Sequence, residues 1–109
     1  MKGISYDLHA RYMMEITKNL LLDLELNSHG ISQPITFMYN DEMIHIKKSG
    51  KRIGKIFLKK YAIVIDIDTT SNLDIVDLID SQTLTYFLIR NISTYIDIEI
   101  ILNNTNIKY

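Results

Sequence analysis

The chain has no cysteine, one proline and four glycines among its 109 residues. The absence of cysteine excludes disulfide bridges, thiolate nucleophiles and cysteine-ligated metal sites, and it is typical of a reducing compartment. No apolar run reaches the roughly 18 residues of a membrane span, and the first residues lack the apolar segment of a signal peptide. We therefore expect a cytoplasmic protein without a membrane-spanning segment.

Neither sign of charge is in large excess. Twelve Lys and Arg residues stand against thirteen Asp and Glu residues, which gives a net charge of −1. So small a sum argues against a globally basic nucleic-acid coat protein and against an acidic mimic of nucleic acid. An apolar content of 47% in a chain of this length predicts one folded domain, residues 1–109. Isoleucine occurs twenty times and alanine twice, a bias typical of AT-rich coding sequence, such as that of a phage or mobile element.

The N-terminal part of the chain predicts a helix from about residue 6 to 19. Apolar residues recur there every four positions, at Leu8, Tyr12, Ile16 and Leu20, and Met13 fills the same stripe. This spacing places them on one face, which we expect to be buried. In residues 20–27 every second residue is leucine, so that segment fits either a strand or a continuation of the helix.

Four short runs rich in β-branched and aromatic residues follow, separated by turn-forming pairs: residues 35–39, 42–48, 51–58 and 61–68. This pattern is typical of an antiparallel meander. Ser49-Gly50 is expected to form a two-residue turn, in which glycine supplies the positive φ that such a turn requires. In that hairpin Lys48 lies opposite Lys51, and Lys47 lies opposite Arg52.

The C-terminal third predicts helix and then strand. One helical pattern begins near Ser71 or Asn72 and another near Asp80 or Ser81, so we expect one or two helices. The second pattern has one apolar face, formed by Leu84, Phe87, Leu88, Ile92 and Tyr95. A strand over residues 96–102 should follow, and its sparsely charged edge offers a site for homodimerisation by strand addition before a polar tail.

The expected fold class is therefore α+β. It consists of an antiparallel meander of four to six strands, with an N-terminal helix and one or two C-terminal helices packed on one face.

No catalytic or cofactor-binding motif emerges from the sequence. Carboxylates at Asp66, Asp68 and Asp74 have the chemistry to ligate Mg²⁺. Alternation along a strand instead favours an exposed face for Asp66 and Asp68, and a spacing of three favours the outer face of a helix for Asp74, Asp77 and Asp80. The histidines lack the spacing of metal ligands. We expect no enzymatic activity, no cofactor and no metal site.

The strongest functional signal is the basic segment, residues 45–60, which contains seven of the twelve basic side chains and no acidic one. These candidate partner-binding residues are Lys47, Lys48, Lys51, Arg52, Lys55, Lys59 and Lys60. A turn at Lys59-Lys60 would place Lys51 opposite Asp68 and leave the charges of Lys47, Lys48, Lys59 and Lys60 exposed and unanswered. Like charges opposed at a hairpin tip destabilise strand pairing, and anionic groups of a partner would relieve the repulsion.

Two hypotheses follow from the basic segment. The first is a small non-enzymatic protein-binding module, such as an inhibitor or immunity-type protein of a phage or mobile element, that binds its protein partner by charge complementarity. The alternative is a nucleic-acid-binding domain that tracks phosphates with the basic hairpin. The near-neutral total charge favours the protein partner.

Overall fold

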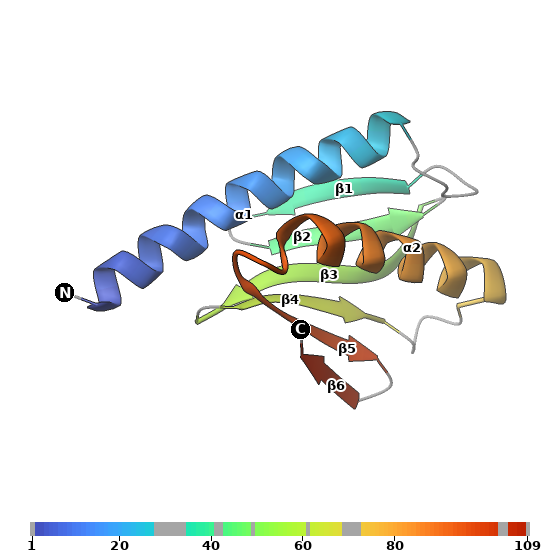
Figure 1. The fold of residues 1–109 in the computed structure, drawn as a ribbon. Coiled ribbons are helices and arrows are strands. Elements are labelled where there is room, and N and C mark those ends of the chain that lie inside the picture. Colours follow the sequence, from blue (N-terminus) through green and yellow to red (C-terminus); the bar gives the residue numbers. More distant parts are fainter. Residues whose placement is uncertain are drawn as a thin grey trace.

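The computed structural model describes residues 2–27, 35–40, 43–48, 50–60, 62–68, 73–102 and 105–108. These residues form two helices and one six-stranded sheet with the strand order β1-β2-β3-β4-β5-β6. Both helices lie on the same side of the sheet, which confirms the α+β class with helices on one face (Figure 1). The elements are α1 (Lys2–Asn27), β1 (Ile35–Asn40), β2 (Met43–Lys48), β3 (Lys51–Lys59), β4 (Ala62–Ile67), α2 (Ile75–Ile92), β5 (Asp97–Leu102) and β6 (Thr105–Lys108).

The sheet is mixed, so the expectation of a purely antiparallel meander is wrong at one position. β1 to β4 form the predicted antiparallel meander, but β5 pairs with β4 in parallel, with Ala62 opposite Asp97 and Ile67 opposite Leu102. The physical reason is the helix between them. α2 carries the chain back to the end of the sheet where β4 began, and a strand that starts from that end must run parallel to β4.

α1 settles the assignment of residues 20–27 in favour of a helix. Its buried side chains follow a helical spacing that includes Leu21 and Leu24, whereas Leu22 is 52% exposed. The predicted face is wrong for Leu8 and Tyr12, whose side chains are 60% and 64% exposed, whereas Met13 is buried and Ile16 and Leu20 are partly buried against the core. The residues that α1 buries are Ala10, Met13, Met14, Thr17, Leu21 and Leu24.

α2 is one continuous helix rather than two. It begins after Asp74, whose carboxylate accepts from the Asp77 N–H at 2.8 Å, while the Asp77 carboxylate accepts from the Asp74 N–H at 3.4 Å. This reciprocal capping box satisfies two N–H groups that the helix itself leaves free. The alternative caps at Ser71 and Asn72 lie outside the described residues.

The core lies between the two helices and the sheet. The predicted buried face of α2 is confirmed for three residues, while Phe87 is only partly buried and Tyr95, beyond the end of the helix, is 64% exposed. The largest side chains at the centre of the core include Leu84, Leu88, Ile92, Ile44, Ile46, Ile56, Ile63, Ile65 and Ile98.

The β2–β3 hairpin has the predicted geometry. Lys48 pairs with Lys51 and Lys47 with Arg52, and Gly50 has a φ of +80°. A β-bulge interrupts the register of the hairpin after Ile46. The register between β3 and β4 differs from the prediction. Lys59 pairs with Ala62 and Gly54 with Ile67, so Lys51 does not lie opposite Asp68, and Lys60 has the positive φ of the turn.

β6 corrects two expectations about the C-terminal end. The polar tail forms a strand that pairs antiparallel with β5, with Ile107 opposite Ile100. β5 therefore has neighbours on both sides, and the expected homodimer by strand addition at residues 96–102 is wrong. The outermost strands of the described sheet are β1 and β6.

Candidate interaction surface

The seven basic side chains of residues 45–60 do not form one surface. Successive side chains of a strand point to opposite faces, so neighbouring cations in the sequence are separated by the thickness of the sheet. Lys48 and Lys51 contact α2 and therefore lie on the helix-covered face. Lys47 and Arg52 are paired neighbours on the opposite face, which we call the open face because no described helix covers it (Figure 1).

On the helix-covered face, four charged side chains form an ion cluster: Lys48, Lys51, Asp77 and Asp80. Lys48 Nζ lies 2.9 Å from Asp77 Oδ1 and 2.7 Å from Asp80 Oδ2. Lys51 Nζ lies 2.9 Å from Asp77 Oδ2. The side chains of Lys48 and Asp80 are each 1% exposed. The predictions of an exposed Lys48 and of outward-facing Asp77 and Asp80 are therefore wrong.

Lys48 and Asp77 keep their charges at neutral pH. Two carboxylates balance two ammonium groups, so the buried net charge is zero. Burial lowers the pKa of Lys48, but the Asp80 and Asp77 carboxylates outweigh it, and the pKa is raised above 10.5. Lys51, with help from Lys48, lowers the pKa of Asp77 from 3.8 to about 2. Groups with such pKa values do not exchange protons near pH 7, so this arrangement suits fixing α2 on the hairpin rather than acid–base catalysis.

Helical spacing is the signal that would have found the acidic half of this cluster. Asp80, Leu84 and Leu88 follow one another at intervals of four, and Asp77 precedes Asp80 by three. In a single helix these positions share one face, so two aspartates stand in line with two fully buried leucines. Dividing the segment into two helices near Asp80 concealed that line.

The centre of the open face is an apolar row across three strands. Met43 pairs with Phe57, and Phe57 pairs with Val64. Val64 is fully buried although no described helix lies over it. Beside it, Lys55 Nζ lies 5.6 Å from the centroid of the Phe57 ring. The members of the row that solvent reaches are therefore Met43 and Phe57, which are partly exposed.

Charge on the open face is divided between its two halves. The β2–β3 half carries the cations, Lys47, Arg52, Lys55 and Lys59. The β4–β5 half carries the anions, Asp66, Glu99 and Asp97. The two halves meet where Lys55 pairs with Asp66 and where Lys59 Nζ lies 3.8 Å from Glu99 Oε1. Lys60 is exposed at the adjoining turn, away from both halves.

The remaining polar candidates do not converge on a site. His9 Nε2 donates to the Tyr95 carbonyl at 2.8 Å and joins α1 to the turn after α2, while His45 lies on the open face beside Lys55. His29 lies outside the described residues. Asp74 caps α2. Among the residues that the structure describes, no three ligand-type side chains gather where they could hold a metal ion.

Comparisons with protein-family models, with curated proteins and with solved structures found no match to this chain. No described helix combines the length and the apolar character that crossing a membrane requires.

Proposed function

We propose that this protein is a small non-enzymatic binding module whose open sheet face recognises a protein partner by charge complementarity. The observation that carries the proposal is the open face itself: partly exposed Met43 and Phe57 lie among the cations of the β2–β3 half, next to the carboxylates of the β4–β5 half. Protein interfaces combine an apolar centre with a polar rim in this way, and matched charges fix the orientation of the partner.

The chemistry of the partner follows from the distribution of charge. Its surface should be acidic opposite Lys47, Arg52 and Lys55, apolar over Met43 and Phe57, and basic opposite the β4–β5 half. An interface that is positive on one half and negative on the other favours one partner and one orientation of that partner. An inhibitor or immunity-type protein acts through this kind of selective, stoichiometric contact, and that is the role we propose.

Nucleic acid fits the same face less well. Phosphates present one sign of charge along the whole backbone, and binding strength grows with the number of phosphates neutralised. Two of the seven cations, Lys48 and Lys51, are already neutralised by α2. Asp66 and Glu99 share the open face with the remaining cations and would repel a phosphate chain that crosses the sheet.

A pair of matched charge reversals tests the proposal. The test variant is Lys47→Glu with Arg52→Glu on the open face, and the control is Lys18→Glu with Arg90→Glu on the two helices. Both variants change the net charge by the same amount. Lys47 and Arg52 are like charges on paired residues, and replacing both leaves a pair of like charges, so we expect little change in stability.

The binding measurement has two steps. The tagged wild-type protein is cross-linked to its partner in cells that encode it, and the purified partner is then titrated calorimetrically with each variant. We expect the test variant to bind at least tenfold more weakly and the control to bind within about twofold of wild type. Equal losses in both variants would contradict the proposal. So would tight binding of arbitrary DNA or RNA in a low-salt retardation assay, with a steep dependence on salt.

A further inference from the structure

β1 is an outer strand of the sheet and lacks the features that usually protect such an edge. One side of β1 pairs with β2 in an unbroken register, and no described strand pairs with its other side. Natural edge strands are commonly short, charged, bulged or interrupted by proline, which discourages pairing with a further strand. β6 at the opposite edge has four residues, one of them a lysine, whereas β1 has six residues, none charged and none a proline. The outer edge of β1 is therefore suited to strand addition.

On the open face, this edge lies close to two cations that lack a counter-ion. Thr36 of β1 pairs with Lys47, and Lys47 pairs with Arg52, so the three residues form one row across the strands. Among the described residues, neither Lys47 nor Arg52 has an ion-pair partner. A strand added to β1 extends this row and lies about 10 Å from β2. Because Thr36 is short, a carboxylate on the added strand can reach the Lys47 ammonium over it.

On the helix-covered face, the same edge is apolar. The Tyr39 hydroxyl donates to the Lys18 carbonyl of α1 at 3.5 Å, so this part of α1 lies over β1. Leu22 follows Lys18 by four residues and therefore lies on the same side of α1, one turn further along. Leu22 and Tyr39 are 52% and 44% exposed. An added strand thus meets apolar side chains on one of its faces and cations on the other.

We propose that the protein partner binds through an extended segment that adds to the outer edge of β1 and alternates carboxylate with apolar side chains. Successive side chains of a strand point to opposite faces, so the carboxylates face Lys47 and Arg52 while the apolar side chains pack beside Leu22 and Tyr39. This inference rests on the proposed function, and it specifies which element of the partner carries the acidic charge.

A second copy of this chain fits the edge less well than an acidic segment does. β1 has no carboxylate to offer to Lys47 and Arg52. In a pair formed by β1 of two copies, the cationic rows of both copies would approach each other across the new junction, and like charges brought together in a sheet are destabilising.

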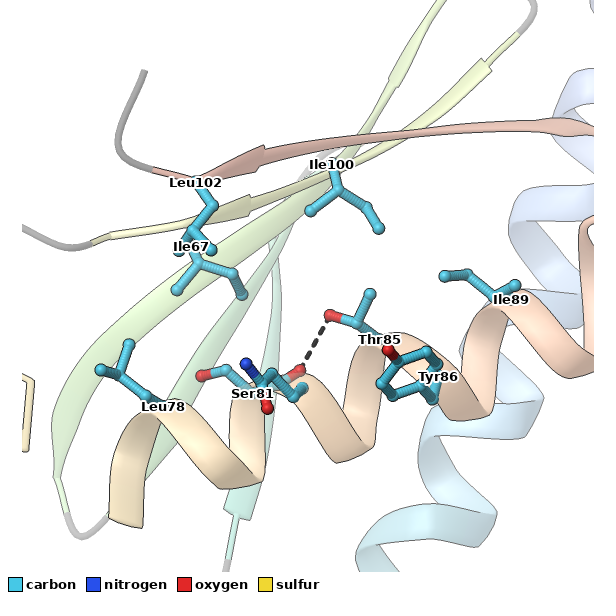
Figure 2. Close-up of a pocket in the computed structure, with 9 residues that line it drawn as sticks. Ile67, Leu78, Ser81, Thr85, Tyr86, Ile89, Ile100 and Leu102 are labelled. Atoms are coloured by element: carbon cyan, nitrogen blue, oxygen red, sulfur yellow. Dashed lines mark hydrogen bonds between the residues drawn. The ribbon is translucent and has the colours of Figure 1, made fainter. Parts of the chain in front are cut away.

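The groove beside α2 also lacks the features that an acidic segment requires (Figure 2). It has a volume of about 200 Å³, and the described residues that line it carry no charge. Its buried hydroxyls, Ser81 and Thr85, already donate to carbonyls of α2 at 2.8 Å. A carboxylate therefore finds counter-ions beside β1 and none in this groove.

A synthetic peptide serves as the probe in the first test. It is blocked at both ends, has the length of β1 and alternates glutamate with valine, and a control peptide has lysine in place of every glutamate. In an NMR titration of the full chain, the glutamate peptide should bind and should protect from hydrogen exchange those β1 amides that do not bond to β2. The lysine peptide should bind at least about tenfold more weakly.

N-methylation of the peptide separates strand addition from binding by charge alone. Successive N–H groups of a strand point to opposite edges, so methylating every valine nitrogen blocks one edge and methylating every glutamate nitrogen blocks the other. One of these two peptides should bind at least about tenfold more weakly than the other. Equal binding of both would overturn the inference. So would protection of every β1 amide before peptide is added, because another occupant would then fill the edge.

Charge substitutions in the protein locate the cationic side of the site. Lys47→Glu with Arg52→Glu should weaken binding of the glutamate peptide at least about tenfold. Lys60→Glu with Arg90→Glu makes the same change in net charge at exposed positions outside β1 and α1, and it should bind the peptide within about twofold of wild type. Equal losses in both variants would overturn the inference.

Two exposed leucines of α1 provide a matched pair for the apolar side. Leu22→Glu should weaken binding of the glutamate peptide, whereas Leu8→Glu should not, because Leu8 lies about 21 Å from Leu22 along the helix. An undiminished affinity in Leu22→Glu, or a wild-type protein that does not bind the peptide, would overturn the inference. Either result leaves the proposed function standing, since titration of the partner itself with the Lys47 and Arg52 variant decides that separately.

Discussion

Replacing Lys48 with methionine tests the ion cluster directly. Methionine keeps a long unbranched stem but lacks the ammonium group, so the packing of the stem is largely retained and the positive charge is lost. Lys48 Nζ lies 2.7 Å from Asp80 Oδ2 and 2.9 Å from Asp77 Oδ1. Lys48→Met therefore leaves a buried excess of negative charge. Asp77 keeps Lys51 at 2.9 Å, while Asp80, whose side chain is 1% exposed, loses a counter-charge 2.7 Å away.

The magnitude follows from the cost of a buried charge that has lost its counter-ion. Removing one partner of a buried ion pair lowers the free energy of unfolding by about 3–5 kcal/mol. A domain of this size has about 5–15 kcal/mol of stability in total, so Lys48→Met should remove a large share of it. Lys51→Met is the matched control. Its side chain is 39% exposed, and Asp77 keeps Lys48 at 2.9 Å after the change, so the expected loss is at most about 1 kcal/mol.

A second substitution separates loss of charge balance from loss of packing. In Lys48→Met with Asp80→Asn, the buried carboxylate most affected by the first change becomes neutral. Because balanced removal of buried charges is far less costly than removal of one partner, the double variant should recover at least half of the loss.

Urea unfolding followed by circular dichroism, with linear extrapolation to water, measures each free energy. A cost below about 1 kcal/mol for Lys48→Met would contradict a stabilising role of the ion cluster, as would a double variant no more stable than Lys48→Met alone.

Three further predictions concern pH, backbone approach and the core. The pKa of Asp77 is lowered to about 2, so its stabilising contribution is present above about pH 4 and lost as the pH falls through 2. Urea unfolding at a series of pH values should show the free energy of unfolding falling by up to roughly 2 kcal/mol over this range, and Asp77→Asn should not show this fall. Gly54→Ala should destabilise the protein more than Gly50→Ala. A Cβ at Gly54 would lie 2.6 Å from the Asp66 carbonyl oxygen, whereas a Cβ at Gly50 has no atom within 4 Å and costs only the strain of a positive φ. Thermal melts of both variants would decide. Leu88→Ala should cost about 2–5 kcal/mol in urea, against less than 1 kcal/mol for exposed Ile79→Ala.

Local chemistry made much of the sheet predictable from the sequence. The strands of the meander follow from β-branched residues between turn-forming pairs, and these preferences act over a few residues at a time. The β2–β3 hairpin is the clearest case. A two-residue turn with glycine at its second position fixes the facing pairs on both sides, so Lys47 opposite Arg52 could be predicted without knowledge of the rest of the chain.

Periodicity was a weaker guide for the helices, because it does not say which part of a wide apolar stripe is buried. In α1 both Tyr12 and Met13 belong to the predicted stripe, yet Met13 is buried and Tyr12 is 64% exposed. The choice depends on where β1 and α2 lie, and those contacts come from distant parts of the sequence. The direction of β5 was undetermined for the same reason, since strand alternation is identical in parallel and antiparallel pairs.

Composition showed that seven cations are concentrated in residues 45–60, and strand alternation implied that neighbouring cations point to opposite faces. Only the tertiary structure decided what each face meets. On one face Asp77 and Asp80 neutralise Lys48 and Lys51, because α2 packs its acidic first turns over the hairpin. On the other face no described helix intervenes, and the cations remain beside an apolar row. Electrostatic attraction depends on distances in space, and a separation of about 30 residues along the chain does not fix that distance.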